Sequence, residues 1–308
     1  VETMREKQKR GSLLWVLDKT KTAMGARTLR SYVEQPLIDA EEIEKRLGAL
    51  EELNARPMER DEIREYLNPI YDLERLITRV TYLTANPRDL IAFKNSIHML
   101  PPIKSLLADF DAELLKEIEE ELDPLEELFD LIEQSIIEEP PVSVREGGLI
   151  KDGYNENVDK YRQAKTEGKT WLAELEAKER EKTGIKNLKI KFNKVFGYYL
   201  EVTNSYKELV PDYFTRKQTL ANAERYITPE LKELEDMILG AEDKLINLEY
   251  DLFCEVRGKI ADEVIRIQKT AKSIAKLDVF VSLAVVADQN NYCRPKMNEN
   301  GVIDIKEG

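Results

Sequence analysis

Basic residues between Gly184 and Pro229 form the part of this sequence whose residue types could do chemistry. The segment holds eight Lys and Arg side chains against four Asp and Glu, a local charge of +4 in a 308-residue chain whose net charge is -13. The rest of the chain therefore carries -17. Because the local field rather than the net charge attracts a polyanion, this segment is predicted to contact phosphate groups.

Residue alternation sharpens this prediction for the first part of the segment. If Leu188, Ile190 and Phe192 face a core, then Lys189 and Lys191 project from the other side of a strand. Such cations neutralise phosphates without reading bases, so we expect non-specific, salt-sensitive contact with double-stranded DNA. In the alternative interpretation, the same lysines form the solvated polar face of a half-buried sheet. The candidate phosphate contacts are Lys189, Lys191, Lys194, Arg216, Lys217 and Arg225.

Other strings imitate catalytic motifs without their context. Gly168-Lys169-Thr170 has the end of a phosphate-binding loop, but Gln163 stands where that loop needs glycine and the surroundings read as helix. Cys254 and Cys293 lie far apart, and His98 is the single histidine, so no metal-ligand spacing occurs. We therefore predict no catalytic, cofactor-binding or metal-binding residues, and no enzyme activity for this chain.

Two long helical patterns flank the basic segment and must position it. They cover residues 155–183 and 229–268, and each needs a partner face that the other can supply. Between them the apolar period changes from 3.6 to 2, which predicts a small antiparallel sheet at the tip of a helical hairpin. The predicted strands are Leu188–Asn193, Tyr198–Thr203, Asp212–Gln218 and Glu224–Thr228.

Shorter helices punctuated by prolines make up most of the remaining sequence, so the predicted fold class is mainly α. Three single residues add detail. Asp39 is predicted to be a helix cap, and Trp15 and Trp171 are expected to be buried. No apolar stretch is long enough for a membrane span or signal peptide, which indicates a soluble, cytoplasmic protein. Helices are predicted at about 22–35, 39–53, 58–67, 69–81, 87–99, 111–122, 124–137 and 272–290.

Three strings then resemble one family, in that family's order. They are Leu13–Arg27, Phe196–Asn204 and Arg216–Lys232, and together they resemble the lever region of bacterial MutS proteins, which act in DNA mismatch repair. The resemblance implies long lever helices that carry a clamp, a small sheet that closes over duplex DNA and contacts its backbone. It also implies that Asn222, in the Leu220–Ala223 turn, lies close to DNA.

The resemblance further implies a division of the chain. Residues 1–153 would form the helical core, 154–183 and 229–290 the lever and C-terminal core helices, 184–228 the clamp, and 291–308 a truncated linker toward an ATPase domain that is missing. Starting at Val1, the chain is expected to be cut from something longer. The family's mismatch-reading Phe-x-Glu motif is absent, since Phe253-Cys254-Glu255 falls within a predicted helix.

The parent protein implied by the resemblance would be a dimeric, nucleoid-associated bacterial ATPase that uses ATP and Mg. In that protein, the lever would transmit the nucleotide state to the clamp, and the partners would be double-stranded DNA and the second subunit. The alternative is a helical scaffold whose basic sheet docks an acidic protein partner.

Overall fold

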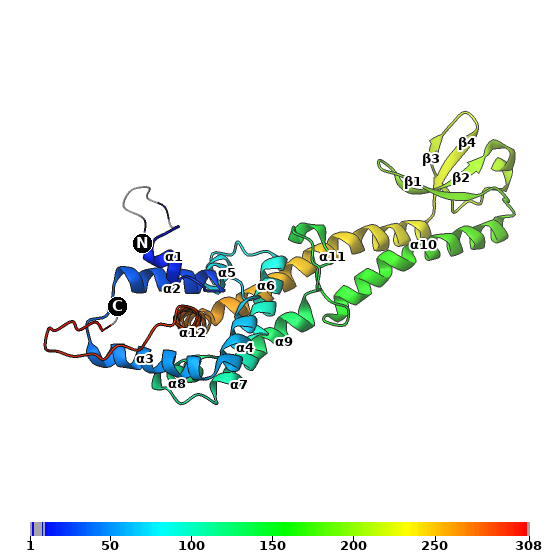
Figure 1. Cartoon of the computed structure of the whole chain (residues 1–308). Coiled ribbons are helices and arrows are strands. Elements are labelled where there is room, and N and C mark those ends of the chain that lie inside the picture. Colours follow the sequence, from blue (N-terminus) through cyan, green and yellow to red (C-terminus); the bar gives the residue numbers. More distant parts are fainter. Residues whose placement is uncertain (1, 3–7, 9, 307–308) are drawn as a thin grey trace. The chain divides into compact units, whose positions relative to one another are not determined.

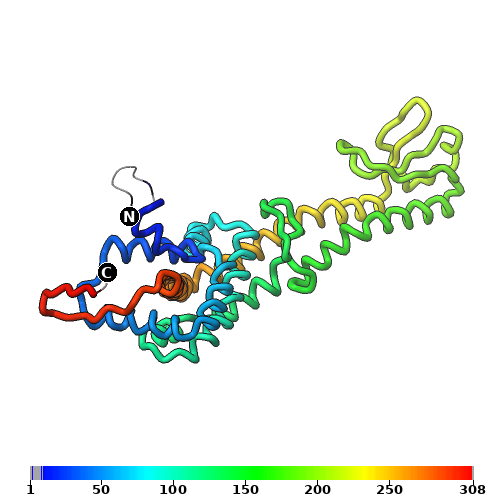
Figure 2. Tube along the Cα trace, in the orientation of Figure 1, coloured from blue at the N-terminus to red at the C-terminus, as the bar shows by residue number. Residues whose placement is uncertain are grey.

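Two structural units make up the chain in a computed structural model that describes residues 2, 8 and 10–306 (Figures 1 and 2). One unit comprises Val1–Val142 and Cys254–Gly308, and the other Ser143–Phe253. The outermost residues of the predicted 1–153 and 291–308 regions lie outside the described residues. The predicted boundaries between core, lever, clamp and linker are functional divisions and stay predictions.

Short helices gathered around one buried helix form the first unit. The central helix, α12 (Val264–Gln289), packs against α2, α3, α4, α5 and α8 (Figure 1). Most of its side chains between Ile267 and Val286 are buried. A helix that is apolar on nearly all sides belongs in a core. The surrounding helices are α1 (Leu13–Leu17), α2 (Ala23–Glu34), α3 (Ala40–Ala55), α4 (Pro57–Leu67), α5 (Leu73–Thr81), α6 (Pro87–Ile97), α7 (Leu100–Leu107), α8 (Glu113–Glu121) and α9 (Glu126–Ser135).

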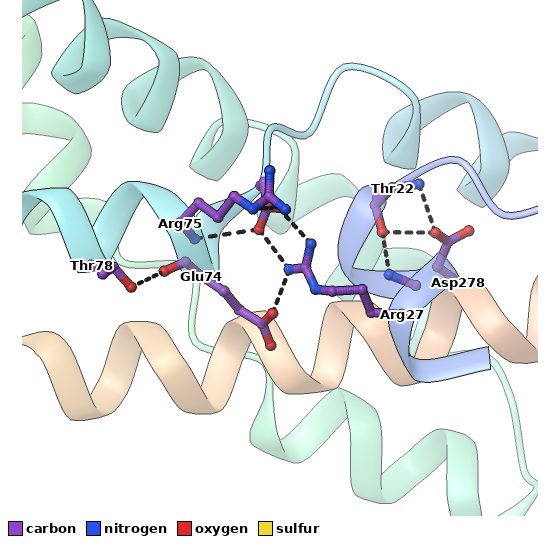
Figure 3. Close-up of polar contacts among 8 residues, drawn as sticks. Thr22, Arg27, Glu74, Arg75, Thr78 and Asp278 are labelled. Carbon is purple, nitrogen blue, oxygen red and sulfur yellow. Dashed lines mark hydrogen bonds and ion pairs between the residues drawn. The ribbon is translucent and has the colours of Figure 1, made fainter. Parts of the chain in front are cut away.

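A buried carboxylate fastens α2 to α12 (Figure 3). Asp278 on α12 accepts hydrogen bonds from the backbone N–H and the hydroxyl of Thr22, both at 2.7 Å, and from the backbone N–H of Lys21 at 2.9 Å. Thr22 in turn caps α2 by accepting the Gly25 N–H. A Cβ on Gly25 would lie 2.2 Å from Asp278 Oδ2, so only glycine admits this close approach. Burial raises the pKa of Asp278, and these donors oppose that shift.

A second polar contact joins α2 to the start of α5. Arg27 binds both carboxylate oxygens of Asp72, at 2.7 and 2.8 Å, and reaches Glu74 at 2.5 Å (Figure 3). Burial pushes the pKa of Asp72 upward, but the hydrogen bonds and charge of Arg27, together with those of Arg75, outweigh it, and the pKa is lowered. Asp72 therefore stays ionised while it also caps α5.

In the second unit, α10 (Glu156–Thr183) runs antiparallel to the first part of α11 (Pro229–Asp262). Ion pairs Lys165–Glu242 and Lys178–Glu230, each 2.7 Å, fix this direction because one partner's number rises as the other's falls. Gly168 faces Ile238, whose Cγ1 would lie 2.7 Å from an added Cβ. The glycine that imitates a phosphate loop therefore serves close helix packing.

The loop before α10 is held by a buried acid. Glu249 on α11 is fully buried, accepts the Gly148 N–H, and pairs with Arg162 at 2.6 Å. Leu149 and Ile150 are buried beside it. This contact pins the loop that redirects the chain into α10 within the second unit.

Between α10 and α11, the chain forms an antiparallel sheet with strand order β1-β2-β4-β3. The strands are β1 (Lys189–Asn193), β2 (Gly197–Thr203), β3 (Thr215–Thr219) and β4 (Ala223–Ile227). Two 3-10 turns, η1 (Val144–Glu146) and η2 (Asn204–Leu209), complete the unit. The mainly α fold with its small sheet insertion is confirmed, as are all four strands to within three residues.

Three details of the predictions were wrong. The long second helix ends at Asp262, not 268, and α12 begins at Val264. The break at Glu263 was not predicted because no proline or glycine marks it. Helix α7 was missed because its two prolines indicate a break in the helical pattern. They fall in the first turn, where the missing N–H groups are tolerated. Trp15 is 49% exposed, since the five-residue α1 buries Leu14 alone. No described helix is long and apolar enough to cross a membrane.

Candidate nucleic-acid interface

One face of the sheet is buried against helices of the second unit. Leu188, Leu200, Val202 and Tyr226 share a core with side chains from both helices. Since neighbouring side chains on a strand alternate, the residues between them must point to the opposite face. The helix residues of this core are Leu172 and Leu175 on α10 and Leu231 on α11.

The strand register collects cations on the opposite face. Lys189 lies opposite Glu201 on β2, Glu201 lies opposite Arg225 on β4, and Arg225 lies opposite Gln218 on β3. Lys191 occupies the next row, opposite Tyr199. We call this surface, defined by Lys189, Lys191 and Arg225, the basic face.

A single carboxylate moderates the charge of the basic face. Glu201 accepts a hydrogen bond from Lys191 Nζ at 2.7 Å and lies 3.9 Å from Arg225 Nε. This hydrogen bond raises the pKa of Lys191, which therefore stays charged well above neutral pH. Three cations against one anion leave the face with a charge of +2.

Arg225 is the best-ordered cation of the three by contact. Its Nη1 donates to Gln218 Oε1 at 2.8 Å, and its guanidinium carbon lies 4.4 Å from the centre of the Tyr199 ring. Tyr199 is buried, so the guanidinium forms part of its cover. The stacking contact and the amide fix the plane of the guanidinium, whose side chain is 19% exposed, so its position costs little entropy to maintain.

The structure places Arg216 apart from the basic face. It lies opposite Tyr226, whose ring is in the core, and it pairs with Glu224 at 3.5 Å, as Lys207 does at 3.0 Å. Glu224 also accepts the Tyr226 hydroxyl, and this bond with those from the cations lowers the pKa of Glu224. Burial of the Tyr226 hydroxyl, followed by its hydrogen bond to Glu224, raises the pKa of Tyr226 to about 12.

The other predicted contacts lie at the edges of the sheet. Lys217 falls in the irregularity between Arg216 and Gln218, where the register of β3 shifts. Asn222 lies in the β3–β4 turn, where its carbonyl accepts the Asn204 N–H at 3.2 Å. Lys194 lies in the β1–β2 turn, at the opposite end of β2. Within the described residues, no hydrogen bond or ion pair joins the side chain of Lys189, Lys194 or Lys217 to another residue.

Leu188, Ile190 and Phe192 lie on the side of β1 that faces the long helices, as predicted, but Phe192 is not covered by them. Leu188 is fully buried and Ile190 half-buried, but Phe192 is 49% exposed. Its ring tilts against Tyr198 at 4.9 Å, and both border a hollow of about 380 Å³ beside α10. The helices cover the start of β1 but not its end, so the alternation continues without burial.

Sequence reasoning missed the contacts that tune this surface. The pairing of Glu201 with Lys191 depends on the β1–β2 register, which cannot be read from the sequence. The sequence shows only that the segment holds four acidic residues. Exposure of Val195 and Phe196 in the turn was likewise missed, although two apolar residues between Lys194 and Gly197 were a signal. Among the described residues, no group of three or more His, Cys, Asp or Glu side chains could hold a metal ion.

Comparison with known proteins gives one consistent result. The family described as MutS domain III matches residues 1–284. Proteins called DNA mismatch repair protein MutS are similar over the whole chain: 66% identical in Lachnoclostridium phytofermentans, 59% in Ruminiclostridium cellulolyticum and 55% in Acetivibrio thermocellus. The chain spans 33% of the first of these relatives and 35% of the other two, about a third of their length.

Proposed function

This chain belongs to the MutS family of DNA mismatch-repair proteins, as its domain III, and from that premise we propose that its sheet binds the backbone of duplex DNA without sequence specificity. The observation that carries the proposal is the row of Lys189 and Arg225 across β1, β2 and β4, with Lys191 beside it, on the face turned away from the helices. Cations in a plane match the surface of a polyanion, and none of them is shaped to read one base.

Salt-titrated binding of the chain to a homoduplex tests this function. Each phosphate contact contributes about 0.9 to the slope of log K against log salt concentration, so Lys189→Gln and Lys191→Gln should each make the slope shallower by about that amount. Lys272→Gln, at an exposed position on α12, is the matched control and should leave the slope unchanged.

Two results would contradict the proposal. Binding that survives both substitutions with its slope intact would remove the basic face from the interface. Preferential binding of an acidic polypeptide over DNA at equal charge would instead favour the alternative, a scaffold that docks an acidic protein. The assay is best run at low salt, because the chain alone lacks the second site that a dimer would supply by linkage.

We propose further that α11 transmits conformational change in the full-length protein. The helix contributes Pro229–Phe253 to the sheet-bearing unit and its remaining residues to the helical unit, without a loop between them. A continuous helix is suited to couple two units, provided that each has more than one state. Hydrogen exchange in the full-length protein should change in α11 and the sheet when the bound nucleotide changes; unchanged exchange would remove this role.

Catalysis is proposed to belong to other parts of the full-length protein, which would use ATP and Mg and act with a second subunit. The chain itself is proposed to be non-catalytic. ATP hydrolysis by the purified chain, above that of a mock purification, would contradict this.

A further inference from the structure

The β1–β2 turn exposes apolar side chains in an unusual setting. Val195 is 82% exposed and Phe196 49% exposed, and Phe192 at the end of β1 is exposed to the same extent. Adjacent exposed apolar residues at the end of a hairpin are a feature of interaction sites, because a solvated surface gains nothing from them.

This turn is held firmly at its base. Asn193 Oδ1 accepts the Val195 N–H at 2.8 Å, and Gly197 adopts φ 76° to close the turn. Glu235 on α11, 6% exposed, accepts the Tyr198 N–H at 2.5 Å and would lie 2.1 Å from a Cβ on Gly197. A buried carboxylate thus ties the turn to a helix of the same unit, so the apolar residues are displayed at low entropic cost.

The sequence of the turn and of the strand before it carries charge of one sign. From Leu188 to Phe196 the sequence contains Lys189, Lys191 and Lys194 and no acidic residue. Lys194 immediately precedes the apolar pair, and the other two lysines belong to the basic face. Of the nearby carboxylates, Glu235 is buried and Glu201 pairs with Lys191, so the charge left beside the apolar tip is that of Lys194. A cation beside an apolar tip is complementary to a surface whose walls are anionic and whose floor is apolar.

We propose that Val195 and Phe196 enter the minor groove of DNA as an apolar wedge while the neighbouring lysines bind phosphates along the groove walls. The inference rests on the proposed function and adds a contact of a different kind. Only the turn residues enter the groove, because a minor groove about 6 Å wide admits side chains but not a two-stranded ribbon. Apolar side chains inserted there unstack a base step partially and widen the contact beyond the backbone.

The wedge is tested with Phe196→Ala and Val195→Ala in the full chain, on a homoduplex that carries 2-aminopurine. Phe196→Ala removes the stacking of an aromatic ring on a base and should bind about tenfold more weakly. Val195→Ala removes apolar contact only and should weaken binding by a smaller factor. The slope of log K against log salt should stay that of the wild type, because no cation is lost. The rise in 2-aminopurine fluorescence on binding should disappear. Leu209→Ala, also 49% exposed in the same unit, is the matched control.

Each outcome decides between the wedge and a rival. Wild-type affinity in both variants, or a loss that equals the loss in Leu209→Ala, overturns the wedge. A weaker affinity with a shallower salt slope also overturns it, since the turn would then only position cations. Binding of the wild type to anionic phosphatidylserine vesicles that Phe196→Ala abolishes, without an effect on DNA, would assign the turn to a lipid surface.

The two proposals fail separately. If Lys191→Gln lowers the salt slope while the apolar variants bind normally, the basic face stands and the wedge falls. If the wild-type chain shows no salt-dependent binding to duplex at all, the proposed function falls and the wedge with it.

Discussion

Removing Glu201 should strengthen DNA binding, and this is the most discriminating prediction for the basic face. The carboxylate pairs with Lys191 at 2.7 Å and lies 3.9 Å from Arg225, so it competes with phosphate for both cations. In Glu201→Gln the side chain keeps its size and an oxygen acceptor but loses its charge. The charge of the face rises from +2 to +3, and the sheet register is unaffected because the backbone pairing of β1 and β2 does not involve this group.

The magnitude follows from the exposure of the pair. The Lys191 and Glu201 side chains are 47% and 21% exposed, so their attraction is of the kind worth about 0.2–1 kcal/mol. Releasing Lys191 should therefore raise the affinity for a homoduplex by about 1.4- to 5-fold at low salt. Lys191 already contributes a phosphate contact in the wild type, so the slope of log K against log salt should stay close to the wild-type slope.

Fluorescence anisotropy with a labelled homoduplex measures both quantities across a salt series. Glu208→Gln is the matched control, because it changes the net charge equally from an exposed position in η2. Side-chain NMR should also find the pKa of Lys191 lower in Glu201→Gln than in the wild type, since the carboxylate whose hydrogen bond and charge raise it is gone. An affinity that is unchanged or lower, or a gain matched by Glu208→Gln, would refute the assignment of this face.

Three further predictions concern stability. Gly197→Ala should lower the free energy of unfolding in urea by more than Gly184→Ala does. Both glycines have φ above 70°, a conformation that costs a non-glycine residue about 1–2 kcal/mol. Only at Gly197 would the added Cβ also meet a carboxylate, 2.1 Å from Glu235 Oε2. Asp278→Asn should destabilise the chain by about 1–3 kcal/mol in the same assay, because an NH₂ group would face the N–H groups of Lys21 and Thr22; an unchanged midpoint would contradict this. The pKa of Glu224 is lowered, so the stability that this carboxylate adds is present at neutral pH and lost as the pH falls through that pKa. The pKa of Tyr226 is raised to about 12, so the stability that this hydroxyl adds is complete below pH 10 and lost as the pH rises through about 12. Melting temperatures against pH should accordingly flatten on the acid side in Glu224→Gln and on the alkaline side in Tyr226→Phe.

Patterns that depend on neighbouring residues were readable from the sequence. The alternation through Lys189–Asn193 predicts its strand because apolar and polar residues separate by face, and Asp39 was identified as a cap that accepts the Glu42 N–H. Helices α10 and α11 follow from their long apolar period. Each of these signals lies within a single helix or a single strand.

Features that need two distant residues were not readable. Nothing near Arg216 indicates that β3 pairs its position with Tyr226, so the sequence groups Arg216 with cations that point the other way. The Asp278–Thr22 contact spans 256 positions and joins residues that look unremarkable alone. Register and tertiary contact decide such cases, and a one-residue shift in pairing would reverse every assignment to a face.

The sheet is joined to its two helices through residues that already terminate them. Gly184 ends α10 in the left-handed conformation, and Thr228 accepts the Leu231 N–H at the start of α11, while Lys178 and Glu230 hold these ends together. Everything from Ile185 to Ile227 is thus an insertion whose removal leaves both helix ends capped. A change of surface charge within the insertion leaves these caps and the core shared with the helices intact, so that charge can diverge between relatives without disturbing the helices that carry it.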